Sequence, residues 1–192
     1  MLRRIQFTKT TKFMKNFVLF LARFAILRGS VVLCQVLESI QTGMFMMVVE
    51  KILIPELGKM YNTTTYDEKR LCCIGFANLA ADTVDKLGLQ YGILVESLVR
   101  LVEASACGPT PLNADDVEEQ GIGLSTLELE RNDPYCKLSY AQHPDVIAAE
   151  IVNFKAYLAE AVMVRAVILK ADSASCINEE IRGFLAGYAQ QV

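Results

Sequence analysis

The chain has 192 residues, 53% of them hydrophobic, and its formal net charge is −3. This length allows one domain, or a short array of repeats, with a buried core. A slightly acidic chain lacks the basic surface typical of nucleic-acid-binding proteins, so nucleic acid is not an expected partner.

The first predicted helix runs from near Lys9 to Arg28 and ends at Gly29, a residue that favours helix termination. Its apolar side chains follow helical spacing at Phe13, Phe17, Phe20, Phe24 and Leu27. A packed amphipathic helix and a membrane segment both fit this pattern. Packing is favoured because Arg23 interrupts an apolar run that is shorter than the roughly 20 residues of a span. At the end of a repeat array, these phenylalanines also predict an exposed apolar patch.

A second helix is predicted from Val31 to Ile40, and a third begins near Gly43 and carries Pro55. Helical apolar spacing continues past Pro55, although an interior proline costs about 3 kcal/mol or more. We expect a structural kink in the helix at Pro55. The alternative is that Pro55 ends one helix and starts another.

The next two helices have clearer signals. Thr65 and Glu68 have the spacing of a capping box, which opens a helix that places Cys72, Phe76 and Leu79 on one face. Another helix is predicted from about Gln90 to Ala106, before Gly108, Pro109 and Pro111. Its inward-facing residues are predicted to be Leu94, Leu98 and Leu101.

An acidic segment at about residues 112–134 has weak periodicity and predicts a loop insertion. Its candidate partner-binding residues are Asp115, Asp116, Glu118 and Glu119. One interpretation is a surface that attracts a basic partner, mainly by steering association. The other is a solvated loop that stays disordered, as charged segments of low hydrophobicity do.

Helical spacing resumes after Pro144, at Ile147, Ile151, Phe154, Leu158 and Val162, and a last helix is predicted from about Asn178 to Ala189. Helices joined by short turns, each apolar on more than one side, favour a stack of repeats. The distance from Met44 to Gln90 fits the period of HEAT-type repeats. We therefore predict an all-α fold, an α-α superhelix of about four HEAT-like repeats. Residues 1–192 are predicted to be one segment of this kind.

The residues that carry chemistry favour a protein that is not an enzyme. His143 is the single histidine, and His143-Pro144 fits a turn before a helix. Gly121 and Gly123 lack the lysine and serine or threonine of a phosphate-binding loop. The six cysteines form no C-x-x-C pair and are interpreted as free, buried thiols. No catalytic, metal or cofactor site is predicted.

Three segments carry a resemblance to a known family. They are "TTKFMKNFVLFLARF", "IQTGMFMMVVEKILIPELGKM" and "EKRLCCIGFANLAAD". In this order they resemble the C-terminal region of the exportin-2 family of nuclear export receptors. The resemblance extends from about Thr10 to Leu101, is strongest at Glu50–Glu56, and returns at "YCKLSYA", Tyr135 to Ala141.

The resemblance implies an arch of HEAT repeats that binds importin-α together with Ran-GTP in the nucleus and releases it in the cytoplasm. It implies a shuttling protein of nucleus and cytoplasm, with no catalytic activity and no membrane partner. The chain corresponds to the last repeats of such an arch, away from the N-terminal repeats on which Ran chiefly docks. Two alternatives stay open: a HEAT-like scaffold or adaptor outside nuclear transport, and a protein anchored in a membrane by its first helix.

Overall fold

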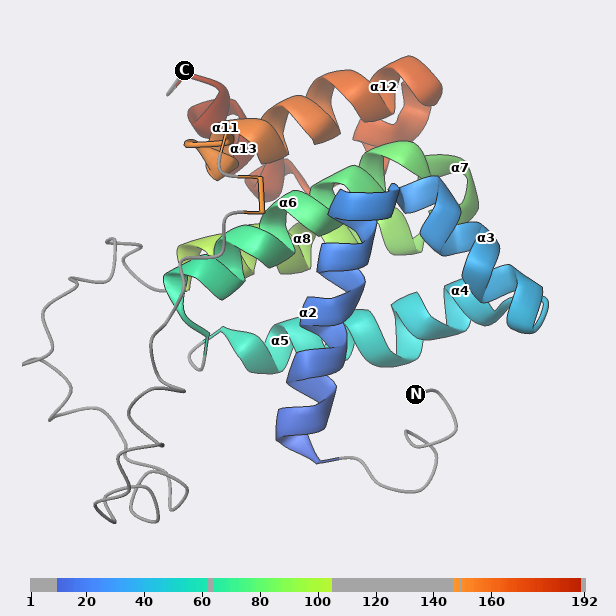
Figure 1. The fold of residues 1–192 in the computed structure, drawn as a ribbon. Coiled ribbons are helices and arrows are strands. Elements are labelled where there is room, and N and C mark those ends of the chain that lie inside the picture. The colour runs from blue at the N-terminus through green and yellow to red at the C-terminus, as the bar shows by residue number, and fades with distance from the viewer. Residues whose placement is uncertain (1–9, 62–63, 105–146, 149, 191–192) are drawn as a thin grey trace, which may run out of the picture. The chain divides into compact units, whose positions relative to one another are not determined.

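The computed structural model describes residues 10–61, 64–104, 147–148 and 150–190. These residues form helices packed against one another, and none of them lies in a β-strand (Figure 1). The prediction of an all-α helical repeat is confirmed. The helical elements are α2 (Thr11–Arg28), α3 (Ser30–Ile40), α4 (Met44–Val48), η1 (Val49–Leu53), α5 (Ile54–Met60), α6 (Tyr66–Asp82), α7 (Val84–Leu87), α8 (Gln90–Glu103), α11 (Phe154–Glu160), η2 (Ala161–Arg165), α12 (Ala166–Leu169), η3 (Ala171–Cys176) and α13 (Glu179–Ala189).

Most helix ends follow the local signals of the sequence. Gly29 has a φ of 91°, a conformation that suits glycine, and it joins α2 to α3. The predicted capping box is present: the Glu68 amide donates to Thr65 Oγ1 at 3.4 Å, and the Thr65 amide donates to Glu68 Oε2 at 3.0 Å. Asn178 caps the last helix, as its predicted start implies.

Helix α6 lies at the centre of the described residues. It contacts α2 and α3, α8, and the segment formed by α11, η2 and α12 (Figure 1). Cys72, Phe76 and Leu79 are buried, as predicted, but burial extends around the helix and includes Lys69, which is 2% exposed. The ammonium of Lys69 donates to the carbonyl oxygen of Tyr61 at 2.9 Å, so its charge is not left without a hydrogen bond.

Helices α2 and α6 approach each other closely at Gly75. A β-carbon added there would lie 2.6 Å from the carbonyl oxygen of Ala22 and 2.8 Å from its α-carbon. These are backbone atoms, which cannot move aside as the end of a flexible side chain can. Gly75 therefore sets the spacing of the two helices.

Pro55 lies in a helical segment that continues on both sides of it. Elements α4, η1 and α5 follow one another without a non-helical residue, and η1 is a π-helical turn. The amide of Ile54 donates to the carbonyl of Val49, five residues earlier. This wider turn lies directly before the proline, which has no amide hydrogen to donate. The kink at Pro55 stays a prediction.

The prediction that helical structure resumes at Ile147 is wrong. Ile147 lies in a turn, Ala148 has a φ of 55°, and Ile151 is not helical, although its amide donates to the Ala148 carbonyl at 3.0 Å. Helix α11 begins at Phe154, after Asn153, whose side-chain oxygen accepts a hydrogen bond from the Ala156 amide at 3.1 Å. The later positions of the predicted pattern are buried as expected: Phe154, Leu158 and Val162.

The other differences are small. Helix α8 ends at Glu103, and its predicted inward leucines are each 0% exposed: Leu94, Leu98 and Leu101. The short elements α7 and η3 were not predicted from the sequence. Each has only four to six residues, too few to show a helical period.

Two glycine substitutions should change stability in opposite directions. Gly75→Ala should lower the free energy of unfolding by about 1–3 kcal/mol, because overpacking against the α2 backbone outweighs the better helix propensity of alanine. Gly58→Ala should raise it by about 0.5–1 kcal/mol, because a β-carbon at Gly58 meets nothing within 4 Å. Urea unfolding of both variants checks this. Equal effects would contradict the close approach at Gly75.

Candidate functional site: a surface for protein interaction

None of the four residues predicted to bind a partner lies among the described residues. Asp115, Asp116, Glu118 and Glu119 lie outside the described residues, so their role stays a prediction. Pro55 is exposed on α5.

Among the described residues, no group of three or more His, Cys, Asp or Glu side chains could hold a metal ion. Cys34, Cys72 and Cys73 are free and buried, as interpreted from the sequence, whereas Cys176 is free and exposed, which corrects that interpretation. Cys107 and Cys136 lie outside the described residues. Burial raises the pKa of the Cys72 thiol far above its ordinary value, and the nearby Glu68 carboxylate adds to the rise. Cys72 is thus a neutral core side chain.

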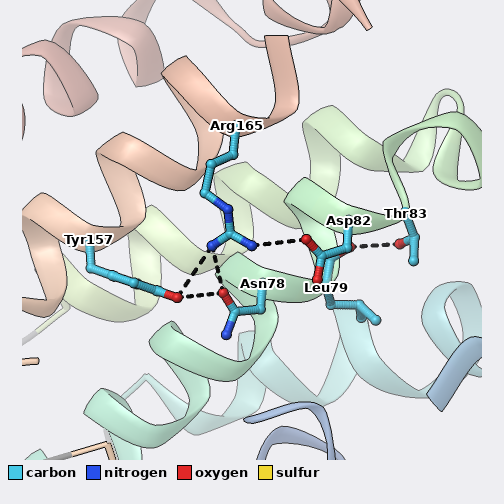
Figure 2. Close-up of polar contacts among 6 residues, drawn as sticks. All are labelled: Asn78, Leu79, Asp82, Thr83, Tyr157 and Arg165. Carbon is cyan, nitrogen blue, oxygen red and sulfur yellow. Dashed lines mark hydrogen bonds and ion pairs between the residues drawn. The ribbon is translucent and has the colours of Figure 1, made fainter. Parts of the chain in front are cut away.

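Four side chains form a polar clasp between α6 and the C-terminal helices: Asn78, Asp82, Tyr157 and Arg165 (Figure 2). The guanidinium of Arg165 donates to Asp82 Oδ1 at 2.9 Å and to Asn78 Oδ1 at 2.8 Å. The Tyr157 hydroxyl donates to the same Asn78 oxygen at 2.6 Å. Beside the clasp, the Thr83 hydroxyl donates to the Leu79 carbonyl at 2.6 Å, where α6 ends.

The π-helical turn η2 places Arg165 in the polar clasp. Residues eight apart in a regular α-helix differ by roughly 80° around the axis. Tyr157 and Arg165 have this separation, yet the Arg165 guanidinium lies 3.3 Å from the Tyr157 hydroxyl. A wide turn adds less rotation per residue, so η2 brings both side chains toward α6.

A second link to α6 is made by Arg70. Its Nε donates to the carbonyl of Ile151 at 3.3 Å, and its Nη1 donates to that of Ile147 at 3.4 Å. Nη2 also donates to the carbonyl of Ala148. A guanidinium has five N–H donors in a fixed plane, which suits a turn whose carbonyls face one point. This contact ties the non-helical residues Ile147, Ala148 and Ile151 to α6 through their carbonyl oxygens.

A groove lies between the end of α8, the start of α11 and α13; we call it the C-terminal groove. Its volume is about 470 Å³, and it is lined by Glu103, Lys155, Glu180, Gly183, Phe184, Gly187 and Tyr188. Glu103 Oε1 accepts from Lys155 Nζ at 2.8 Å and from the Tyr188 hydroxyl at 2.6 Å. The hydrogen bond from Lys155, followed by that from Tyr188, lowers the pKa of Glu103. The groove therefore keeps an ionised carboxylate in a fixed position.

Exposed apolar side chains lie on α2 and α3, and on α2 they alternate with the exposed charged residues Lys12, Arg23 and Arg28. Phe17 is buried and Phe20 is 44% exposed, so the predicted patch is present only in part on the first helix. None of the exposed residues of α3 is charged. The exposed apolar residues of the two helices are Phe20, Leu27, Val31, Val32, Val36 and Ile40.

The described residues thus define an α-helical repeat protein with a groove and with exposed apolar side chains on α2 and α3. No single described helix has the length and apolar character to cross a membrane, and only the pair Ser30–Ile40 and Met44–Met60 meets these criteria, bent by 106°. Residues 1–185 match the family model for the C-terminus of CAS/CSE protein, and the chain belongs to this family.

The relatives carry the name exportin-2. The chain is 29% identical over 200 residues to exportin-2 of Xenopus laevis and 28% identical over 199 residues to that of Homo sapiens, with 98% of this chain covered in each case. Exportin-2 of Danio rerio is 33% identical over 105 residues, which cover 53% of this chain and 10% of that protein. The chain spans 20% of the length of the frog and human relatives. No solved structure gives a significant match.

Removing the guanidinium from the polar clasp should weaken the attachment of the C-terminal helices. Arg165→Met keeps much of the apolar stem and should lower the free energy of unfolding by about 1–2 kcal/mol. The low end of the range applies because the side chain is 34% exposed. A double-mutant cycle with Asp82→Asn, followed by urea unfolding, measures the coupling.

The matched control is Arg100→Met. Arg100 pairs with Glu96 at 2.6 Å, but its side chain is 61% exposed, and the expected cost is less than about 0.5 kcal/mol. Equal costs for Arg100→Met and Arg165→Met would show that the polar clasp contributes no more than an ordinary surface pair.

The lowered pKa of Glu103 predicts a pH-dependent contribution to stability. A carboxyl group with a depressed pKa in the folded state stabilises the fold above its ordinary pKa of 4.5, and this contribution is lost as the pH falls through the lower folded value. Glu103→Gln should therefore be less stable than the unmodified chain at neutral pH, with the difference shrinking in acid. Urea unfolding across this pH range measures it, and Glu179→Gln on α13 is the control. A constant difference at every pH would contradict the prediction.

Proposed function

We propose that the chain is the C-terminal part of a nuclear export receptor that returns importin-α to the cytoplasm together with Ran-GTP. The family match over residues 1–185 and the exportin-2 relatives that cover 98% of the chain carry this proposal. The proposed receptor moves between nucleus and cytoplasm and is not an enzyme. The two partners, importin-α and Ran-GTP, are inferred from the resemblance to exportin-2.

The described helices support a binding role for this segment. Arg70 and the polar clasp fix the C-terminal helices to α6, so the surface they form is held in one arrangement. Charged and polar groups on a rigid surface can be matched by a partner without a large cost in ordering. We infer that this segment supplies part of the importin-α surface, while Ran-GTP docks chiefly on the N-terminal repeats.

Separation from those repeats should remove the cooperation between the two partners. Linked sites are coupled by about 1–3 kcal/mol, which corresponds to roughly 5- to 150-fold in affinity. The chain alone should bind labelled importin-α weakly, and Ran-GTP should change that affinity by less than about fivefold. Fluorescence titration with and without Ran-GTP measures both quantities. Tight binding that Ran-GTP strongly enhances would show that this chain carries both sites.

A chimera tests the proposal in a complete receptor. This chain replaces the matching C-terminal fifth of Xenopus laevis exportin-2, and importin-α binding is measured with Ran-GTP present. The chimera should bind within about tenfold of the frog receptor, whereas a chimera carrying an unrelated helical repeat should not. Equal loss in both chimeras would favour the alternative, a HEAT-like scaffold outside nuclear transport.

The acidic segment can be tested in the same chimera. Changing Asp115, Asp116, Glu118 and Glu119 to lysine should slow association and flatten its salt dependence if these residues face a basic partner. The control changes the same residues to asparagine and glutamine, which removes charge without reversing it and should have a smaller effect. Unchanged association in both variants would favour a solvated loop with no role in binding.

A further inference from the structure

We propose that the C-terminal groove binds an arginine side chain presented by a peptide segment of a partner protein. Glu103 and Glu180 supply carboxylates, Phe184 supplies an aromatic face, and Gly183 and Gly187 admit the partner's backbone. This inference rests on the proposed function, because it gives the chemistry of one contact on the proposed partner-binding surface.

The groove has more negative than positive charge. Lys155 is the single cation among the residues that line it, and two carboxylates face it. Glu103 uses only Oε1 for its bonds to Lys155 and Tyr188, and its Oε2 has no partner among the described residues. The Glu180 carboxylate has no hydrogen bond or ion pair within the same described part of the chain. With Lys155 paired to Glu103, the groove carries a net negative charge, and its carboxylate on Glu180, unpaired within those residues, can accept a cationic side chain of a partner.

Two glycines keep the groove open. Gly183 and Gly187 lie one turn apart on α13, where each costs up to about 1 kcal/mol in helix propensity relative to alanine. A β-carbon at either position would meet nothing within 4 Å, whereas one at Gly92 would lie 2.0 Å from the Cys176 carbonyl oxygen. Packing within the described residues thus requires Gly92 but neither groove glycine. Glycine at such a position lets another backbone approach closely.

The aromatic side chains favour arginine over lysine. Phe184 is 40% exposed beside the glycines, and Tyr188 is buried beneath Lys155, whose ammonium lies 5.2 Å from its ring centre. An exposed ring next to a free carboxylate suits a planar guanidinium, which can stack on the ring and pair with the carboxylate at the same time. An ammonium can make the ion pair and a cation–π contact, as Lys155 does over Tyr188, but it has no flat group that stacks on a ring while it pairs with a carboxylate.

The test uses the whole chain and a defined probe. Acetyl-Ala-Arg-Ala-amide is titrated into the isotope-labelled chain, and the backbone amides are followed by NMR. Shifts should be centred on Gly183, Phe184 and Gly187. The same peptide with citrulline, which keeps the shape of arginine without its charge, should bind at least about tenfold more weakly. The lysine peptide should lie between the two.

Two variants separate the groove from the general acidity of the surface. Glu180→Gln and Gly187→Leu should each weaken arginine-peptide binding by at least about tenfold. The first removes a charge, and the second fills part of the C-terminal groove with a side chain. Glu179→Gln, an exposed neighbour outside the groove, and Gly58→Leu, an open helical glycine on α5, are the matched controls and should change binding less than twofold. Unfolding midpoints confirm folding, and Glu180→Gln decides the test if Gly187→Leu does not fold.

Three outcomes would overturn the inference: equal binding of the citrulline peptide, shifts centred away from α13, or equal losses in Glu179→Gln and Glu180→Gln. Importin-α binding to the chain and to the chimera is measured separately. Peptide binding in the groove without importin-α binding to the chain or the chimera would overturn the proposed function and leave this inference standing. Importin-α binding without peptide binding would overturn this inference and leave the proposed function standing.

Discussion

The burial of α6 on nearly all sides is the constraint on which the rest of the fold depends. A helix in that position must satisfy each polar group from within the protein. Lys69 reaches a backbone carbonyl, Arg70 reaches the turn at 147–151, and Asn78 and Asp82 meet Arg165. The polar residues of α6 therefore satisfy their own hydrogen bonds and, through these bonds, fix the positions of the neighbouring elements.

Two π-helical turns change the direction of side chains at places where a regular α-helix would lose a hydrogen bond or a side-chain contact. In η1 the turn precedes Pro55, which cannot donate a hydrogen bond. In η2 it rotates Arg165 toward α6, where the guanidinium meets three side chains of the polar clasp. Both turns occur inside longer helical segments, so the chain changes the direction of a side chain without ending the helix.

Local signals predicted most of the helices but little of the candidate site. Apolar spacing, the Thr65–Glu68 capping box and Gly29 located helix ends, because each signal depends on residues only a few positions apart. The polar clasp joins residues 79 to 87 positions apart, and nothing local links Asp82 to Arg165. At Ile147 the apolar spacing predicts a helix, but the carbonyl of Ile147 accepts a hydrogen bond from the distant Arg70, which local spacing does not reveal. In the groove, the spacing of Gly183 and Gly187 is visible in the sequence, but their proximity to Glu103 is not.

The polar clasp has a consequence for how the chain can be divided. The elements before residue 105 and those after residue 146 are joined by buried side chains such as Phe154 and Leu158, and by the hydrogen bonds of Arg70 and Arg165. These contacts are non-covalent, so we expect them to form between separate pieces as well. Two separately expressed pieces, cut within 105–146, should assemble as a non-covalent pair, and the dissociation constant of that pair would report the total free energy of the contacts that the C-terminal helices make with α6, α7 and α8.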